Sequence, residues 1–205
     1  MSPYVIDLSH WNTITDWTAI PDAGIVGVIH KATEGDSYFD PTYTPRRRLA
    51  RDAGLEWGAY HFLRPGDMEA QANYFLAKAK PDENTLLAAD HEDAGVSLND
   101  LKLFLRTVNN ALPQVPLLYS GNLIKEQIGN SRDAELANYR LWLAQYTSGQ
   151  PSWPKATWPS WWLWQYSDQG SIDGVSGAVD LNTHRQSHLL LADWTGSSWG
   201  GSVTV

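Results

Sequence analysis

Three acidic residues follow one short apolar run in the middle of the sequence, and two of them could do chemistry together. The run begins at Leu86 and leads into Asp90, His91, Glu92 and Asp93, of which all but His91 are acidic. Side chains two positions apart on a strand point the same way, so Asp90 and Glu92 would share one side, about 6.6 Å apart at Cα, while His91 faces away. Such a pair can supply an acid and a carboxylate for general acid–base catalysis. The alternative is a solvated acidic loop in which Asp93 caps the following turn.

The elements that must position these carboxyl groups are short apolar runs, each of which ends on a polar or aromatic residue. Their near-continuous apolar character is typical of strands that are buried on both faces. Because helical segments alternate with the early runs, the sequence predicts a parallel barrel of the α/β class. The eight predicted strands are 4–7, 24–31, 56–61, 86–90, 116–120, 141–146, 162–166 and 177–180.

Helices are predicted only between the early strands. They cover 43–52, 67–80 and 98–112, and each has a start or stop signal such as the capping Ser97. The later connections, 147–161 and 167–176, contain three prolines and two glycines respectively, which exclude ordinary helices. We therefore expect a TIM-like barrel that is flattened, because helices cover one side only, and whose last strands are joined by loops. An antiparallel pair is expected where a connection is too short for a crossover.

Catalytic groups of such barrels lie at the carboxyl ends of the strands. This rule places four acids on one rim, namely Asp7, Asp90, Glu92 and Asp180. It adds Lys31, Tyr60, His61, Tyr119, Gln145 and Gln165. Like charges raise one another's pKa, so that one acid of the group can stay protonated near neutral pH. A protonated acid beside a carboxylate is the arrangement that cleaves glycosidic bonds, and the joint pattern favours a site over the solvated loop.

Tryptophan is the outlier of the composition, with 11 residues, five of them between Trp153 and Trp164. Indole rings stack on the apolar faces of sugars, but they also fill bulky core space. We expect about half of the tryptophans in each role.

The composition excludes several classes of partner and cofactor. The formal net charge of −8 leaves no basic face for nucleic acid. Without cysteine there is no disulfide framework, cysteine-ligated zinc or cysteine nucleophile. His184 and His188 stand four apart, but neither a Glu beside the first nor a third ligand completes a zinc motif. Gly-x-Ser-x-Gly and phosphate-binding loops are absent, so no metal and no cofactor is predicted.

The length of 205 residues predicts one domain over 1–192, followed by a Gly/Ser-rich tail over 193–205. We expect a monomer without membrane insertion, because no segment reaches transmembrane length. The residues after Met1 lack the basic and apolar regions of a signal peptide, which predicts synthesis in the cytoplasm. Secretion is the alternative if a leader has been removed.

The chain resembles glycoside hydrolase family 25, the muramidases called Chalaropsis-type lysozymes, which also occur among phage endolysins. The resemblance spans residues 4–185 and begins with the motif Val-Ile-Asp7-Leu-Ser-His10-Trp11. Its other segments are 31–35, 58–62, 90–92, 118–120, 141–144, 164–166 and 179–180. It implies hydrolysis of the β-1,4 bond between N-acetylmuramic acid and N-acetylglucosamine in peptidoglycan glycan strands. It also implies a flattened barrel with eight strands and fewer than eight helices.

The resemblance assigns roles to the rim residues. Glu92 is the general acid, and Asp90 stabilises the anomeric centre or acts as the nucleophile. Asp7 and Asp180 would orient this pair and tune its protonation. Because the substrate carries a 2-acetamido group, we expect retention by substrate assistance. The predicted substrate-binding residues are Trp11, Lys31, Tyr60, His61, Tyr119, Trp142 and Gln165.

Two other interpretations of the sequence can be told apart from a muramidase by their acidic residues. A non-catalytic sugar-binding protein would be free to replace Asp90 or Glu92, and a chitinase-like barrel enzyme would carry a longer acidic motif on the fourth strand. Family members often carry wall-binding repeats, which this sequence lacks, so we expect an endolysin that acts on the cell wall after release through a partner membrane pore.

Overall fold

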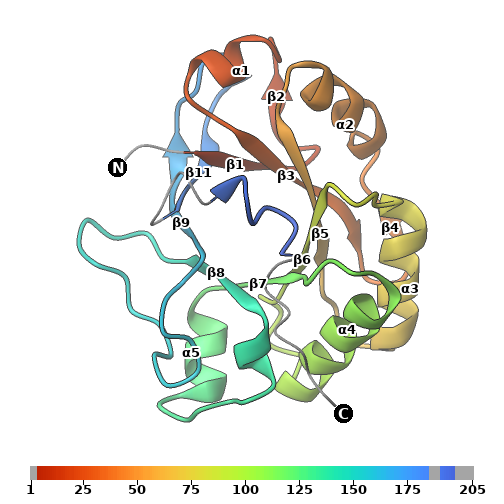
Figure 1. Cartoon of the computed structure of the whole chain (residues 1–205), viewed down its shortest axis with the longest axis vertical. Helices are drawn as coiled ribbons and strands as arrows, with labels where there is room; N and C mark the ends of the chain where they lie inside the picture. Colours follow the sequence, from red (N-terminus) through yellow and green to blue (C-terminus); the bar gives the residue numbers. More distant parts are fainter. Residues whose placement is uncertain (1–3, 185–189, 197–205) are drawn as a thin grey trace.

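The computed structural model describes residues 4–184 and 190–196, and its central feature is a closed barrel of eight strands (Figure 1). The strands pair in the order β1, β11, β9, β8, β7, β6, β5 and β3, and β3 pairs back onto β1. They are β1 (Val5–Leu8), β3 (Gly27–Glu34), β5 (Glu56–Phe62), β6 (Thr85–Asp90), β7 (Leu117–Ser120), β8 (Arg140–Ala144), β9 (Leu163–Gly170) and β11 (Val179–His184). Each overlaps one of the eight apolar runs, so the predicted strand set is confirmed.

All neighbouring barrel strands are parallel except β11, which is antiparallel to both β9 and β1. The short connection between β9 and β11 carries only β10 (Val175–Ser176), which pairs with β2 (Thr13–Ile14). A connection of this length cannot make a parallel crossover, so the chain turns back along β9. The predicted antiparallel pair is therefore confirmed, although β9 runs on to Gly170 through a segment that was expected to be a loop.

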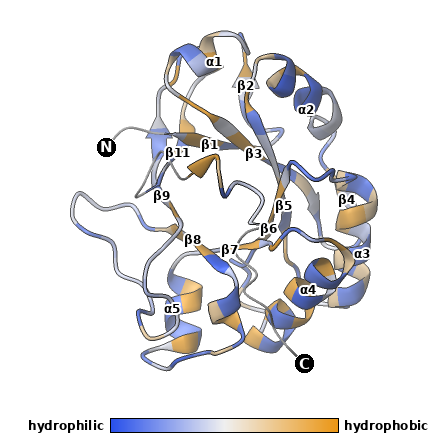
Figure 2. Cartoon of the chain, viewed as in Figure 1, coloured by the Kyte–Doolittle hydropathy of each residue, from blue (hydrophilic) through white to orange (hydrophobic). Residues whose placement is uncertain are grey.

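The three predicted helices are present as α2 (Tyr43–Asp52), α3 (Met68–Ala79) and α4 (Leu98–Ala111). The Asp67 side chain caps α3, and Ser97 with Asp100 forms a capping box on α4. Two shorter helices, α1 (Ala19–Asp22) and α5 (Asn122–Ile128), a 3₁₀ turn (Leu136–Asn138) and the two-residue strand β4 (Tyr38–Phe39) were not predicted. Figure 2 shows hydrophobic and hydrophilic residues alternating around α4 and α5, as expected for helices that pack one face on the barrel.

Residues 145–162, between β8 and β9, form no helix, and tryptophan side chains pack in the space that a helix would otherwise fill. Trp158 is buried and its indole N–H donates to the Tyr139 carbonyl at 2.9 Å. Trp161 and Trp164 are buried beside each other, with ring centroids 5.7 Å apart. These indole rings fill the space outside the barrel that the proline-rich connection leaves without a helix.

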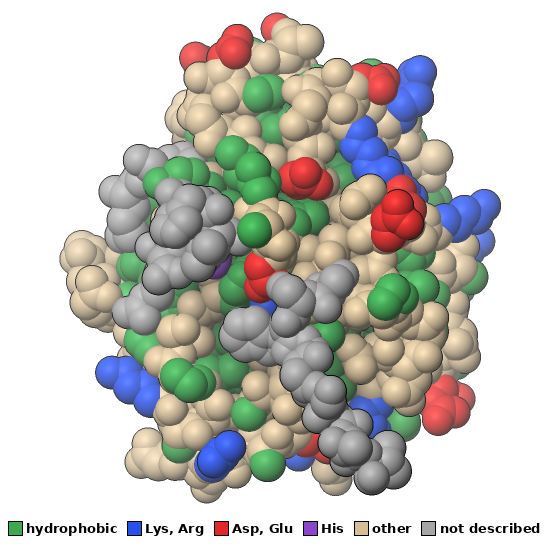
Figure 3. Space-filling model, viewed as in Figure 1, with side chains coloured by type: hydrophobic (Ala, Val, Ile, Leu, Met, Phe, Trp, Pro, Cys, Tyr) green, Lys and Arg blue, Asp and Glu red, His purple; other side chains and the backbone are tan. Residues whose placement is uncertain are grey.

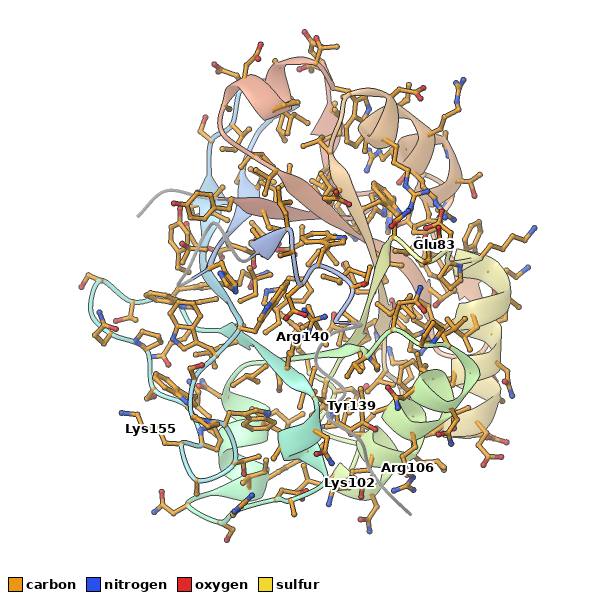
Figure 4. All side chains as sticks on the ribbon, in the orientation of Figure 1. Glu83, Lys102, Arg106, Tyr139, Arg140 and Lys155 are labelled. Atoms are coloured by element: carbon orange, nitrogen blue, oxygen red, sulfur yellow. The ribbon has the colours of Figure 1, made fainter. Side chains whose placement is uncertain are left out.

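The amino end of the barrel is closed by residues 190–196, which cross the centre of the view in Figure 1. The Trp194 ring is buried there, its N–H donates to the Trp57 carbonyl at 3.1 Å, and it lies where a Cβ on Gly27 would collide. Arg140, labelled near the centre of Figure 4, donates to the Asp193 carbonyl and lies 4.2 Å from the centre of the Trp162 ring. The domain boundary at residue 192 stays a prediction, because residues 197–205 of the expected tail lie outside the described residues.

Among the described residues, no helix combines the length and apolar character that a membrane span requires.

Candidate active site

A cleft of about 280 Å³ opens at the end of the barrel where the parallel strands terminate, and ten of the eleven predicted site residues line it. The ten are Asp7, Trp11, Lys31, Tyr60, Asp90, Glu92, Tyr119, Trp142, Gln165 and Asp180. All eight barrel strands, or the residues directly after them, contribute. Side chains alternate along each strand, so one of every two points into the barrel and the other toward the outer layer.

Asp90 and Glu92 form a hydrogen-bonded pair of carboxyl groups in this cleft. Asp90 is the last residue of β6 and is buried, whereas Glu92 is exposed at the cleft mouth although protein atoms surround most of its carboxyl group. Burial raises the pKa of both groups, and the charge of Glu92 raises the pKa of Asp90 further. A pair of this kind holds one proton between its members and presents an acid beside a carboxylate.

His91 lies on the opposite side of the chain, as the alternation predicted. It is buried, and its Nε2 lies 2.8 Å from the side-chain oxygen of Gln127 in α5. This contact ties the chain segment that carries Glu92 to the helix layer. One oxygen of Asp90, Oδ1, is buried and has no hydrogen-bond partner among the described residues. A ligand with an N–H group at that oxygen would satisfy it.

Asp7 and Asp180 form a second pair, directly opposite each other on β1 and β11. Burial raises the pKa of Asp7, and burial together with the charge of Asp7 raises the pKa of Asp180 to about 8. The prediction that Asp180 lies at the carboxyl end of a strand is wrong. It lies near the amino end of β11, which reaches the same rim because β11 is antiparallel to its neighbours.

Aromatic side chains of very different exposure line the cleft. Trp11 is 84% exposed, and its ring lies beside that of His10, with ring centroids 4.4 Å apart. Trp142 is buried, and its ring lies edge-on to Tyr119 at 4.5 Å. Seven of the ten described tryptophans are buried, and Trp11 and Trp142 are the two that line the cleft. The expectation that about half of them would line a sugar-binding cleft is therefore wrong.

Lys31 lies on one flank of the cleft and is already paired. Its ammonium group contacts the Glu34 carboxylate, which also accepts a hydrogen bond from Arg64 at 2.6 Å. The same ammonium group lies 5.1 Å from the centre of the Phe62 ring. Lys31 thus gives this flank a positive charge that is balanced by a neighbouring acid.

Gln145, predicted on the same rim, does not line the cleft, and its side-chain oxygen accepts from Lys125 at 2.6 Å. His61 is the predicted substrate-binding residue that the structure places outside the cleft. It is fully buried, its Nδ1 lies 2.7 Å from the Thr33 hydroxyl, and its ring stacks on Phe104 of α4 at 4.8 Å. The reason is alternation along β5, because Tyr60 and Phe62 take the cleft side and turn His61 toward the helices. His61 is therefore withdrawn from the predicted substrate-binding residues.

Four residues of the site were missed. Ser9, Phe62 and Tyr146 line the cleft, and Asn182 lies buried beneath it with its amide on Asp7. The signal for Asn182 was present, since it stands two positions after Asp180 and so shares its face of the strand. It was overlooked because the predicted strand ended at Asp180.

No group of three or more His, Cys, Asp or Glu in the described part of the chain could hold a metal ion. His188, one of the two histidines considered for zinc, lies outside the described residues.

Known proteins match both the sequence and the fold. Lysozyme M1 of Streptomyces globisporus is 31% identical over 194 residues, which cover 86% of this chain and 66% of that protein. The N,O-diacetylmuramidase of Chalaropsis sp is 27% identical over 198 residues, covering 85% of this chain and 94% of that protein. The chain thus spans about two thirds of the first relative and nearly the whole of the second.

The crystal structure of the bacterial lysozyme from Streptomyces coelicolor has the same fold, with a TM-score of 0.85 at 28% identity. The match covers 97% of this chain and 99% of that one. The sequence profile of glycosyl hydrolases family 25 matches residues 6–175, a stretch that contains six of the eight barrel strands, most of β1 and three of the four cleft acids. The chain belongs to glycosyl hydrolases family 25.

Proposed function

We propose that this glycoside hydrolase is a muramidase that cleaves the β-1,4 bond between N-acetylmuramic acid and N-acetylglucosamine in peptidoglycan. The observation that carries the proposal is the hydrogen-bonded pair Asp90 and Glu92 in the cleft. Support for the substrate comes from relatives named lysozyme and N,O-diacetylmuramidase. The enzyme would accordingly act on the cell wall, which it reaches after it has been synthesised.

Glu92 is the general acid in this proposal. It lies at the cleft mouth, where the bridging oxygen of a long glycan strand would pass, and burial raises its pKa, which favours the protonated acid that this role needs. Its proton goes to the bridging oxygen as the bond from that oxygen to the anomeric carbon breaks. In the second step the Glu92 carboxylate takes a proton from water, and the water oxygen forms the new bond to the anomeric carbon as the bond from that carbon to the acetamido oxygen breaks.

Asp90 supports the substrate's own 2-acetamido group in this proposal. Its carboxylate would accept the amide N–H and so polarise the acetamido oxygen for attack on the anomeric carbon. The support for this role is that Oδ1 is buried and has no hydrogen-bond partner among the described residues. Two attacks on the same carbon give net retention of configuration. The alternative role is direct attack by Asp90 itself, with the same outcome at the anomeric carbon.

Trp11, Tyr60 and Tyr119 supply surfaces for sugar rings in this proposal. Trp11 is the strongest candidate, because so exposed an indole gains most from stacking on an apolar sugar face. We propose that the enzyme acts as a monomer, since the cleft is built from one chain.

The test is digestion of purified, N-acetylated peptidoglycan, followed by mass spectrometry of the soluble products. The proposal expects fragments that end in reducing N-acetylmuramic acid. Reducing N-acetylglucosamine ends would contradict the bond assignment. Free stem peptides with intact glycan would contradict glycan hydrolysis altogether, and binding without any product would favour a sugar-binding protein.

A further inference from the structure

A buried asparagine lies directly beneath the second pair of acids. Asn182 is fully buried inside the barrel, opposite Val5 on β1. Its Oδ1 accepts the indole N–H of Trp142 at 2.7 Å, and its Nδ2 lies 3.3 Å from the Val5 carbonyl and 2.7 Å from Oδ2 of Asp7. An indole N–H can only donate and a carbonyl can only accept, so both neighbours fix the same orientation of the amide. The Asn182 N–H must therefore point at Asp7.

A second amide points at the same carboxyl group. Gln165 Nε2 lies 3.1 Å from Oδ1 and 3.0 Å from Oδ2 of Asp7. Its Oε1 accepts the hydroxyl groups of Tyr119 at 2.9 Å and Tyr146 at 2.8 Å. Both oxygens of Asp7 thus face N–H donors, and a carboxyl group that accepts at both oxygens is favoured in its ionised form.

Asp180 faces Asp7 from the paired strand. Side chains in register on antiparallel strands lie about 5 Å apart at Cβ, a distance at which two carboxylates repel strongly. The two carboxyl groups lie close enough to share a hydrogen bond, and one proton between them would relieve the repulsion. We propose that Asn182, held by the Trp142 indole, is a positioning residue that keeps Asp7 ionised and places the shared proton of the pair on Asp180.

Other groups around Asp180 favour the same state. The acids Asp168 on β9 and Glu92 beyond β6 lie near Asp180 and repel a negative charge there. The hydroxyl groups of Tyr60 and Tyr146 also lie near it, but they are neutral and no hydrogen bond joins them to Asp180 among the described residues. No cation of the described residues is among the causes that shift the pKa of Asp180. Its surroundings therefore oppose a negative charge, whereas those of Asp7 supply donors.

A neutral Asp180 has a consequence for the reaction, and this consequence rests on the proposed function. A charge on Asp180 would be one of the causes that raise the pKa of Glu92. With one proton on Asp180 and one in the pair Asp90 and Glu92, the four acids of the cleft carry about two negative charges instead of four. Glu92 can then give up its proton in the first step and serve as a base in the second.

The experiment is a ¹³C NMR titration of the aspartate carboxyl carbons in the intact protein. The Asp7→Asn and Asp180→Asn variants assign the two signals. At pH 7 we expect the ionised chemical shift for Asp7 and the protonated shift for Asp180, which then titrates near pH 8. A protonated Asp7 beside an ionised Asp180 would overturn the proposal; the variants serve only for assignment, and both protonation states are read from the wild-type protein.

The Asn182→Ala variant tests the role of the amide. Loss of the donor should raise the titration midpoint of Asp7 by at least about one pH unit. The matched control is Thr183→Val, the next residue on β11, which should leave the midpoint unchanged. An unmoved Asp7 midpoint in folded Asn182→Ala would overturn the proposal. If the protein releases no glycan products, the proposed function fails, but the titration still decides where the proton lies.

Discussion

Two carboxyl groups only two residues apart lie in different surroundings in this protein. Asp90 is buried at the end of β6 with one oxygen unpartnered, while Glu92 reaches the cleft mouth. The difference suits a division of labour, because an acid that exchanges protons with water needs access and a group that polarises the substrate does not. We therefore place the proton transfer on Glu92 and the support of the acetamido group on Asp90.

Replacement of Glu92 tests this assignment. Glu92→Gln keeps the shape of the side chain but cannot give a proton to the leaving oxygen, so kcat on peptidoglycan should fall at least about 10²-fold. Thermal unfolding should show little loss of stability, because the change removes a crowded charge. The control is Glu83→Gln, an exposed acid labelled in Figure 4, in the turn before β6. Near-normal turnover in Glu92→Gln would move the acid role to Asp180.

The role of Asp90 is tested by the substrate. Two matched glycans are needed, one N-acetylated and one with a free amine at the muramic acid that is cleaved. Without the acetamido group the substrate has no internal nucleophile, so kcat should fall by at least about 10²-fold while binding is retained. Comparable rates on both glycans, or a covalent adduct on Asp90, would make Asp90 the nucleophile.

The residues of the site were predictable to the extent that strand alternation determines direction. It placed Asp90 with Glu92 and turned His91 away. The same rule would have excluded His61, had it been applied to Tyr60 and its neighbour. Tyr146 was missed because the strand was predicted to run to Tyr146 with Gln145 on the rim, whereas β8 ends at Ala144 and alternation along the strand does not apply beyond it.

At the scale of elements, the strands and long helices could be predicted because each carries its own apolar pattern. The bounds of α2 were predicted to the residue, and α4 by its cap and stripe. The direction of β11 depends on the length of its connection to β9. From the sequence, an antiparallel pair was expected wherever a connection is too short for a crossover, but the strand concerned was not identified. Helices α1 and α5 were missed, since four and seven residues are too few to show an amphipathic period.

The capping box on α4 gives a prediction at this scale. The Ser97 hydroxyl accepts the Asp100 backbone N–H at 3.2 Å, and the Asp100 carboxylate accepts from the Ser97 hydroxyl and backbone N–H. Ser97→Ala should lower the free energy of unfolding by about 1 kcal/mol, as is typical of a lost N-cap. Urea unfolding measures this, and kcat should not change. Ser97→Thr, which keeps the hydroxyl, should retain most of the stability, and an equal loss in both variants would contradict the capping argument.

At the scale of the whole molecule, buried titratable groups make the stability depend on pH. Burial raises the pKa of Asp180 to about 8, and burial lowers those of His30 and His61 to about 4. The folded state thus prefers a protonated Asp180 and neutral histidines.

Figure 3 shows acidic side chains interspersed with basic ones on the amino end of the barrel, without a continuous basic face.

These shifts predict a decline of stability above neutral pH. The folded pKa of Asp180 lies above its unfolded value, so its contribution is present at low pH and is lost as the pH rises toward 8. The histidines act in the opposite sense, but only below about pH 6.5. The free energy of unfolding should therefore fall between pH 6.5 and about pH 8.5. The slope of the free energy of unfolding against pH should be flatter in the Asp180→Asn variant. The control is Asp173→Asn, at an exposed acid before β10, which should leave the slope unchanged. An unchanged slope in Asp180→Asn would contradict the explanation.

In the proposed reaction, the cleft adds water across a glycosidic bond at the anomeric carbon of N-acetylmuramic acid. Digestion of peptidoglycan in ¹⁸O-labelled water, with fragmentation of the products by mass spectrometry, shows where the water oxygen goes. We expect one ¹⁸O atom at the reducing carbon of muramic acid, and much less of this product with Glu92→Gln. Label in peptide carboxyl groups, or cleaved glycan without any label, would rule the proposed reaction out.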